Sequence, residues 1–271
     1  MTAATGCQPI NERKTIMTTI LESKALIKDY STGKNQSQRV LHGISVAIKE
    51  TQLVSIMGPS GSGKSTLLYN ISGMDKATSG HVIFDGKELT SMNEEELAKL
   101  RLFEMGFVFQ QSNLLKNLNL LDNIIVGSYH RKNVDRNDLS KRAMELMEKT
   151  GVAELAGNDV TQASGGQLQR VAICRALINQ PKILFGDEPT GALNSKSTNE
   201  ILDIFDDINR DGTTVIMATH DVKVAARSER VLFMLDGEIT GDYKMSKYNK
   251  SKDDLKKREE ELSSWLVGKG F

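Results

Sequence analysis

The chain has 271 residues, of which 39% are apolar, and this is enough to bury one large core or one core with an inserted lobe. Its 35 basic residues balance its 35 acidic residues, so the overall charge recruits neither nucleic acid nor an anionic membrane surface, and we expect no nucleic-acid partner. The longest apolar runs, such as Val231–Leu235, fall far short of the roughly 20 residues of a spanning helix, which predicts that the chain does not itself cross a membrane.

The first 20 residues are polar and are expected to form a disordered leader. Within it, Ala4–Cys7 resembles a lipid-attachment site, but the basic start and apolar stretch of a secretory signal are missing, so we expect no anchor. Met17 stands just before the first strand-like segment, and the sequence does not decide between Met1 and Met17 as the start.

The chain has two cysteines, which are too few and too different in setting to form a disulfide framework, and this favours a reducing cytoplasm. Cys174 lies among apolar residues at helical spacing, where a small buried side chain is expected.

Strands and helices alternate along most of the chain, which predicts an α/β fold. The apolar run Leu53–Met57 enters a glycine-rich turn and then a helix that starts near Lys64. Residues 182–185 and 214–217 are two further candidates for buried strands. Each of the three runs ends at a polar group, and open parallel sheets bind their ligands beyond the carboxyl ends of their strands. The core sheet is therefore expected to be parallel.

Two dipeptides, Asp85-Gly86 and Asp236-Gly237, stand between apolar segments and predict hairpin turns, so an antiparallel margin is expected near each end of the core. Helical patterns replace strand patterns between about residues 91 and 165, which predicts an inserted helical lobe. Ser91 with Glu94 has capping-box spacing, and Asp138 is expected to cap a second helix that ends at Gly151. No internal repeat indicates a second nucleotide unit.

Residues 58–65, Gly-Pro-Ser-Gly-Ser-Gly-Lys-Ser, form the strongest single motif and are called the phosphate loop below. Its glycines let backbone amides converge on phosphates, its lysine reaches the outer phosphates, and the hydroxyl of Ser65 can ligate Mg²⁺. This predicts ATP with Mg²⁺ as the bound species. The residues expected at the nucleotide are Gly58, Ser60, Gly61, Ser62, Gly63, Lys64, Ser65 and Thr66.

Two other strand ends supply groups for hydrolysis. Asp187 follows an apolar strand and is expected to hold Mg²⁺, while Glu188 beside it can polarise the attacking water. His220 ends another core strand, from which it can reach the γ-phosphate, and Asp221 after it is expected to cap a helix.

The signature segment, Ser164-Gly165-Gly166-Gln167, predicts a second phosphate-binding element. Ser164 and Gln167 have capping-box spacing at the start of an apolar helix, so free amides point outward from that end. One nucleotide site does not need two such elements. The economical explanation is a homodimer in which two ATP molecules are sandwiched head to tail.

With these motifs in order, residues 21–242 resemble the ATP-binding subunit of ABC transporters. In that resemblance the phosphate loop is Walker A, residues 185–188 are Walker B, and residues 164–167 are the signature motif. The resemblance further implies that Gln110 contacts Mg²⁺ and the attacking water, that His220 is the switch histidine, and that Tyr30 stacks on adenine. It also implies an integral membrane permease as partner, and hence a place on the cytoplasmic face of the cell membrane.

Two positions depart from the family pattern. Ala163 replaces the leucine that usually precedes the signature serine, and Asn194 replaces the aspartate of the D-loop. Asn194 can still cap the helix that follows, whose apolar face carries Ile201, Ile204, Phe205 and Ile208. Because it carries no charge, we hypothesise that it loosens the coupling between the two ATP sites.

Within the family, residues 73–75, 106–111 and 187–193 resemble the branch that exports macrolides or releases lipoproteins. Residues 194–196 and the tail resemble bacitracin-type exporters of antimicrobial peptides. The resemblance leaves macrolide export, lipoprotein release and cell division as alternatives. An ABC ATPase with no transport role is a further alternative, but such proteins carry two ATP units or long coiled coils, and this chain shows neither.

Two segments have alternative interpretations. The leucine cluster after Gln110 could line a docking groove for the permease or belong to the core of the lobe; it comprises Leu114, Leu115, Leu118, Leu120 and Leu121. Residues 244–271 predict a charged amphipathic helix with a narrow apolar stripe, ended by residues 268–271. That helix could pack on its own domain or contact a partner.

Overall fold

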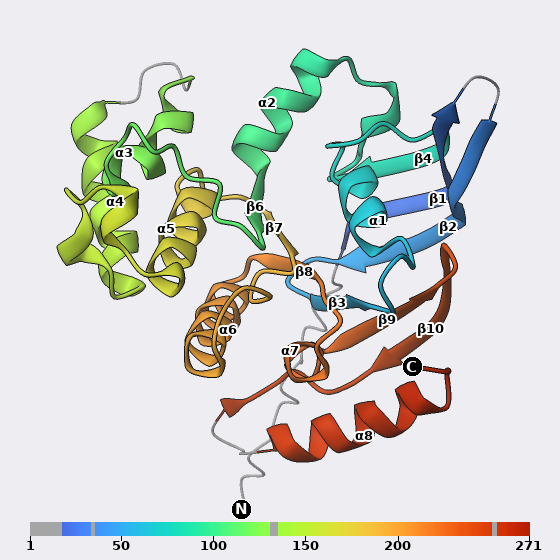
Figure 1. Cartoon of the computed structure of the whole chain (residues 1–271). Coiled ribbons are helices and arrows are strands. Elements are labelled where there is room, and N and C mark those ends of the chain that lie inside the picture. The colour runs from blue at the N-terminus through green and yellow to red at the C-terminus, as the bar shows by residue number, and fades with distance from the viewer. Residues whose placement is uncertain (1–17, 34–35, 131–134, 251–253) are drawn as a thin grey trace, which may run out of the picture.

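The computed structural model describes residues 18–33, 36–130, 135–250 and 254–271 of the chain, whose helices and strands are arranged as in Figure 1. The expected leader, with Cys7, lies up to residue 17 outside the described residues. Strand β1 begins at Thr19. The predicted α/β class, with a parallel core sheet and antiparallel margins, is confirmed.

The core sheet has six strands, and every neighbouring pair is parallel except the pair of β9 and β10. In order across the sheet the strands are β10 (Glu238–Lys244), β9 (Arg230–Leu235), β3 (Leu53–Met57), β8 (Thr214–Ala218), β7 (Ile183–Asp187) and β6 (Met105–Phe109). Every residue of β3 and β8 is buried, as their continuous apolar sequences predict. The polar residues that follow β3, β6, β7 and β8 therefore gather at one edge of the sheet.

A second sheet of four antiparallel strands stands beside the core sheet (Figure 1). Its strands, in order, are β2 (Gln36–Lys49), β1 (Thr19–Gly33), β4 (Ser79–Phe84) and β5 (Lys87–Glu88). Both predicted hairpin turns are present, and in each the aspartate and the glycine have positive φ, 47° and 75° in Asp85-Gly86 and 47° and 77° in Asp236-Gly237. Two positive φ angles are typical of the type I′ turn, which the Asp-Gly pair favours.

Helix α1 (Lys64–Ile71) lies between the two sheets, and its Leu67, Leu68 and Ile71 share one hydrophobic cluster with residues of both. The other face of the core sheet is covered by α5 (Gly165–Leu177), α6 (Ser195–Arg210) and α7 (Val222–Ala225). The predicted apolar face of α6 packs there. Because α1 directly follows the phosphate loop, its packing against both sheets also fixes the position of the loop.

The helical lobe lies to one side of the sheets (Figure 1). Its core joins α3, α4 and α5 and includes Cys174, whose thiol pKa burial raises to about 11. Strand β6 falls inside the range expected to be helical. The sequence did not predict it, because periodicity cannot distinguish a strand from a helix in an apolar run of only five residues. The helices of this region are α2 (Glu94–Glu104), α3 (Leu120–Ile125), α4 (Arg136–Lys149) and α5, with 3₁₀ turns at Leu89–Ser91, Val126–His130, Ala153–Leu155 and Val160–Gln162.

Two predicted caps are wrong by two or three residues. Helix α2 is capped by Asn93 with Glu96, not by Ser91 with Glu94, because Ser91 ends a 3₁₀ turn and its hydroxyl donates to the carbonyl of Glu88 (2.9 Å). Helix α4 is capped by Asp135, which accepts from the amide of Asn137, while Asp138 lies within the first turn. The expected caps at Ser164, Asn194 and Asp221 are confirmed.

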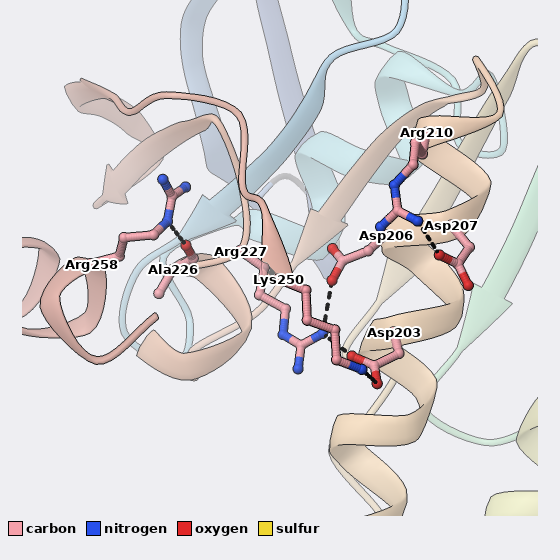
Figure 2. Close-up of polar contacts among 8 residues, drawn as sticks. All are labelled: Asp203, Asp206, Asp207, Arg210, Ala226, Arg227, Lys250 and Arg258. Atoms are coloured by element: carbon pink, nitrogen blue, oxygen red, sulfur yellow. Dashed lines mark hydrogen bonds and ion pairs between the residues drawn. The ribbon is translucent and has the colours of Figure 1, made fainter. Parts of the chain in front are cut away.

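The tail helix α8 (Leu255–Val267) packs on its own domain. Leu262 and Leu266 are buried against α7 and β9, and the ring of Trp265 lies 5.0 Å from that of Tyr243. Arg258 donates to the backbone carbonyls of Ala226, Ser228 and Ser246, and Figure 2 shows the first of these contacts. Of the two interpretations, packing on the domain is therefore observed. Within the part of the chain that the structure describes, no helix is both long and apolar enough to span a bilayer.

Candidate ATP-binding and hydrolysis site

The phosphate loop connects β3 to α1 and is held in one shape by the close approach of other backbone. A Cβ atom on Gly58 would lie 2.1 Å from the carbonyl oxygen of Met234, so no side chain fits there. Gly63 has a φ of 96° and serves as the N-cap of α1 without a side chain to occupy the first amides of the helix. The loop therefore presents open backbone donors at a helix N-terminus, as phosphate binding requires.

The polar side chains of this loop suit an anionic ligand. The ammonium of Lys64 donates to the carbonyls of Gly58 and Pro59, both at 2.9 Å, and burial lowers its pKa. Among the described residues, the buried hydroxyl of Ser62 has no hydrogen-bond partner. A buried hydroxyl without a partner is costly unless something else satisfies it, and a phosphate oxygen would do so. The loop thus fits a nucleotide phosphate chain.

Asp187, at the end of β7, accepts hydrogen bonds from two residues of α1. The hydroxyl of Ser65 donates to Oδ1 (2.8 Å), and that of Tyr69 donates to Oδ2 (2.5 Å). Burial, reinforced by Asp187, raises the pKa of Tyr69, so that hydroxyl stays a donor at neutral pH. Each oxygen of the Asp187 carboxylate therefore accepts one hydrogen bond from α1, and the two bonds together fix its orientation.

The Ser65–Asp187 pair fits Mg²⁺, which prefers hard oxygen ligands and is usually held by one or two carboxylates together with substrate phosphates. Across the described residues there is no group of three or more His, Cys, Asp or Glu side chains that could hold a metal ion. The two oxygens therefore make a partial ligand set, which phosphate oxygens and water would complete.

Glu188 and His220 come together at the ends of the neighbouring strands β7 and β8. The Nδ1 atom of His220 lies 2.8 Å from Oε1 of Glu188. The backbone of Glu188 has a φ of 48°, and its amide donates to the carbonyl of Ala218 (2.9 Å). Left-handed backbone in a residue other than glycine is uncommon and is found where a site requires it.

Gln110 joins this group from β6. Phe109 is the register partner of Asp187, so Gln110 and Glu188 both leave the sheet at the same end of this strand pair. The amide nitrogen of Gln110 lies 3.1 Å from the position a Cβ atom would occupy on Gly191. The structure thus brings Gln110, Glu188, His220, Asp187 and the phosphate loop to one place.

The signature segment lies elsewhere, at the start of α5 on the lobe (Figure 1). Ser164 accepts from the amide of Gln167, whose side chain accepts in return from the amide of Ser164, as the capping box predicts. Gly165 and Gly166 pack against Leu193 and Ser197, and a Cβ atom on Gly166 would lie 2.9 Å from the Ser197 hydroxyl. The segment therefore rests on the turn before α6 and leaves its helix end at the surface.

Tyr30 lies on β1, and its hydroxyl donates to Asp75 (2.6 Å). Burial raises the pKa of Tyr30, and Asp75 adds to this effect. A hydrogen bond with the side chain of Thr66 acts in the opposite direction and lowers the pKa. The ammonium of Lys28 sits 4.6 Å from the centre of the ring. The residue is 39% exposed, so part of its side chain remains open to a ligand.

Three residues outside the predicted set contact the site or the segments that adjoin it. The contact of Tyr69 with Asp187 could have been predicted from the sequence, because Tyr69 stands four residues after Ser65 and so lies on the same face of the helix. Gln169 donates to the carbonyls of Phe109 and Pro189, and Arg175 donates to those of Ser112 and Asn113. No local sequence signal predicts these last two contacts, because they join segments 20 to 63 residues apart.

Comparison with known proteins agrees with the geometry. A model of the ABC transporter family matches residues 41–191. The lipoprotein-releasing system ATP-binding protein LolD 1 of Chlorobium chlorochromatii is 41% identical over 225 residues, which are 83% of this chain and 92% of that protein. The macrolide export ATP-binding/permease protein MacB of Psychrobacter cryohalolentis is 41% identical over 231 residues, 85% of this chain and 34% of its own length. The chain thus spans about a third of that relative.

Among solved structures, the ATP-binding cassette MJ0796, a dimer in a post-hydrolysis state bound to ADP and Pi, superposes with a TM-score of 0.78. It is 39% identical, and the match covers 84% of this chain and all of that one. The chain therefore belongs to the ABC transporter family, as an ATP-hydrolysing member that works with ATP and Mg²⁺.

Proposed function

We propose that two copies of the chain sandwich two ATP molecules head to tail and that closing and reopening of this dimer drives a membrane permease. The observation that carries the proposal is the position of the signature segment, which lies on the lobe at the start of α5 and not beside α1 of its own copy. A second copy would bring that exposed helix end to the phosphates. The dimeric state of the related cassette MJ0796 supports this arrangement.

In this proposal each site residue has a distinct role. The phosphate loop, with Gly58, Ser60, Gly61, Ser62, Gly63, Lys64 and Thr66, binds the phosphate chain, while Ser65, Asp187 and Gln110 hold Mg²⁺. When bound, the metal ion neutralises charge on the β- and γ-phosphates. Tyr30 stacks on the adenine of the same nucleotide. Ser164, Gly165, Gly166 and Gln167 of the other copy bind its γ-phosphate.

For hydrolysis, the Glu188 carboxylate accepts a proton from water as the water oxygen bonds to the γ-phosphorus and the bond to the ADP oxygen breaks. His220 holds that carboxylate through the 2.8 Å contact and faces the γ-phosphate. Glu188 directly follows Asp187, so in this proposal the base stands next to the carboxylate that would hold Mg²⁺.

A groove beside Gln110 supports contact with a permease at the cytoplasmic face of the membrane. It has a volume of about 410 Å³ and lies between α2, β6 and the start of the lobe. Apolar residues at its rim, Met74 and Val126, are exposed. The leucine cluster contributes little to it, because Leu120 is buried in the lobe core, Leu114 and Leu121 pack on that core, and only Leu115 of the five is strongly exposed, at 48%.

The transported substrate is a finer proposal. The relatives named above act in macrolide export and lipoprotein release, whereas residues 194–196 and the tail favour export of, or resistance to, antimicrobial peptides such as bacitracin. Replacing the native gene with a Glu188→Gln allele separates these roles. At least a fourfold fall in the minimal inhibitory concentration of bacitracin, with macrolide tolerance unchanged, is expected. The reverse result would assign the protein to macrolide export, and misplaced lipoproteins with both tolerances unchanged would assign it to lipoprotein release.

The dimer is tested with the same substitution in purified protein. Glu188→Gln removes the base but keeps the size of the side chain, so ATP with Mg²⁺ should accumulate a stable dimer on gel filtration with light scattering. Adding Lys64→Ala should abolish that dimer by removing a phosphate contact. A Glu188→Gln protein that stays monomeric at saturating ATP and Mg²⁺ would contradict the sandwich.

A further inference from the structure

Gln169 stands on α5, two residues after the signature segment, and points into the molecule. Only 2% of the residue is exposed. Its amide nitrogen donates to the carbonyl of Phe109 at 2.8 Å and to that of Pro189 at 2.7 Å. Both partners are carbonyl oxygens, which only accept, so the nitrogen must face them and both of its hydrogens are used.

The two acceptors adjoin the catalytic groups. Phe109 directly precedes Gln110, and Pro189 directly follows Glu188. They emerge from the paired strands β6 and β7, at the end of the ladder where Phe109 is the partner of Asp187. One buried amide therefore fixes the backbone on either side of the space between Gln110 and Glu188.

The helix that carries this amide joins the lobe to the core sheet, on which its Ile173 packs. Val171 and Cys174 of α5 are buried in the lobe core, whereas the two acceptors belong to segments leaving the core sheet. Farther along α5, Arg175 donates to the carbonyls of Ser112 and Asn113, so the helix also holds the segment that follows Gln110. A displacement of α5 relative to the sheet would act first on these hydrogen bonds.

We propose that Gln169 is a positioning residue that links α5, which begins with the signature segment, to Gln110 and Glu188 of the same copy. The inference rests on the proposed head-to-tail dimer. In that dimer the end of α5 binds the ATP of the partner, while Gln110 and Glu188 act on the ATP of their own copy. Gln169 then transmits the engagement of one site to the base of the other.

The test begins with Gln169→Met, which keeps the length of the side chain and removes both donors. Small errors in the placement of a catalytic group are costly, so kcat should fall about 10- to 100-fold while KM for ATP stays within about threefold. Gln169→Glu should lower kcat further, because it sets a carboxylate against two carbonyls. Val171→Ala is the matched control, since it removes packing from the same helix without reaching either loop, and it should lower the melting temperature at nearly unchanged kcat.

Mixed dimers, purified through two different affinity tags, separate positioning from a general weakening of the helix. In the first, one copy carries Gln169→Met and the other carries Glu188→Gln, so the single working base lies in the copy with the lesion. In the second, one copy is unchanged and the other carries both substitutions, so the lesion lies in the copy that contributes only its signature segment. The reference is a mixed dimer in which one copy is unchanged and the other carries Glu188→Gln alone. Relative to it, the inference predicts that the ATPase rate falls 10-fold or more in the first mixed dimer and stays within threefold in the second.

Two results would overturn the inference: an unchanged kcat in Gln169→Met, or a loss as large in the second mixed dimer as in the first. Failure of the dimer itself is seen separately, because Glu188→Gln alone would then form no dimer with ATP and Mg²⁺. In that case a kcat loss in Gln169→Met at unchanged KM would still support positioning within one copy, and only the link to the partner would be lost.

Discussion

The Nδ1 atom of His220 lies 2.8 Å from Oε1 of Glu188, so a group from the end of β8 holds the base at the end of β7. The two strands are parallel neighbours, and the amide of Glu188 also donates to Ala218 of β8. Strand β8 thus anchors the backbone of Glu188 through Ala218, while the imidazole of His220 contacts its carboxylate. The histidine was expected to reach the γ-phosphate, and this contact gives it a second task on the base.

His220→Ala should lower kcat about 100-fold, within the range that general acid–base groups contribute. KM for ATP should change little, because the phosphate loop still holds the nucleotide. His220→Asn separates the two tasks, since its amide can donate from nearly the position of Nδ1 but has nothing in place of Nε2. We expect this variant to recover about tenfold of the loss in steady-state assays. Equal activity of the two variants would show that the contact with Glu188 contributes nothing to kcat.

Tyr69→Phe should weaken Mg²⁺ binding. It removes the hydroxyl that donates to Asp187, and groups that orient a metal ligand typically contribute 10- to 100-fold to metal affinity. We expect the Mg²⁺ concentration for half-maximal ATPase to rise about tenfold. The ratio of ATP affinity with Mg²⁺ to that in EDTA should fall by a similar factor, which is a measurement independent of turnover.

The phenylalanine is its own packing control, because the ring keeps its edge contact with Phe109, whose centre lies 6.4 Å away. Stability should therefore drop by no more than about 1 kcal/mol, the usual net contribution of one hydrogen bond. An unchanged Mg²⁺ requirement in a protein of normal stability would rule out the orienting role.

The groups of the site that could be predicted from the sequence are those at the ends of strands or within one continuous turn. The phosphate loop, Asp187, Glu188 and His220 follow apolar runs that had to be parallel neighbours, so their meeting at one edge followed from the pattern. Gln169 could not be predicted in this way, because its partners at positions 109 and 189 come near it only when the lobe docks on the sheet.

The misplaced caps have a local cause that spacing does not reveal. Both Ser91 with Glu94 and Asn93 with Glu96 satisfy the capping-box pattern, and the 3₁₀ turn at Leu89–Ser91 decides between them by using the serine hydroxyl. In the tail, periodicity predicted a helix but not its partner. That partner depends on Gly241, where a Cβ atom would lie 2.7 Å from the ring of Trp265.

Tyr30→Ala should raise KM for ATP about tenfold at nearly constant kcat, because stacking of a base on an aromatic ring contributes about 1–3 kcal/mol. Lys28 occupies one side of the ring, so the adenine is expected on the other. Tyr30→Phe tests the role of the ring alone, since it loses the hydrogen bond to Asp75 but keeps the stacking surface. Its KM should stay within about threefold of the parent. If Tyr30→Ala bound ATP as tightly as the parent in equilibrium dialysis, the adenine would have to lie elsewhere.

Asp206 on α6 is expected to make the free energy of unfolding depend on pH. Its side chain is 11% exposed and accepts from Arg227 (2.8 Å), which also bonds Asp203, itself paired with Lys250 (Figure 2). Burial raises the pKa of Asp206 to about 6, although Arg227 acts to lower it. In the unfolded chain the pKa of an aspartate is about 3.9.

Because the folded state holds this proton more tightly, Asp206 contributes stability at low pH that is lost as the pH rises through 6. Linkage sets the loss at about 2 kcal/mol between pH 4.5 and pH 7.5. Asp206→Asn cannot titrate, so the unfolding free energy of the parent minus that of the variant should fall by this amount over the interval. Urea denaturation at several pH values measures it.

Asp207→Asn is the matched control for that measurement. Asp207 lies next to Asp206 on α6 but is exposed and bonds only to Arg210 among the contacts drawn in Figure 2. Its pH curve should run parallel to that of the parent, because an exposed ion pair adds little stability. If the curve of Asp206→Asn also ran parallel to the parent between pH 4.5 and 7.5, the buried carboxyl would titrate as it does in the unfolded chain, and the ion pair with Arg227 would fully offset its burial.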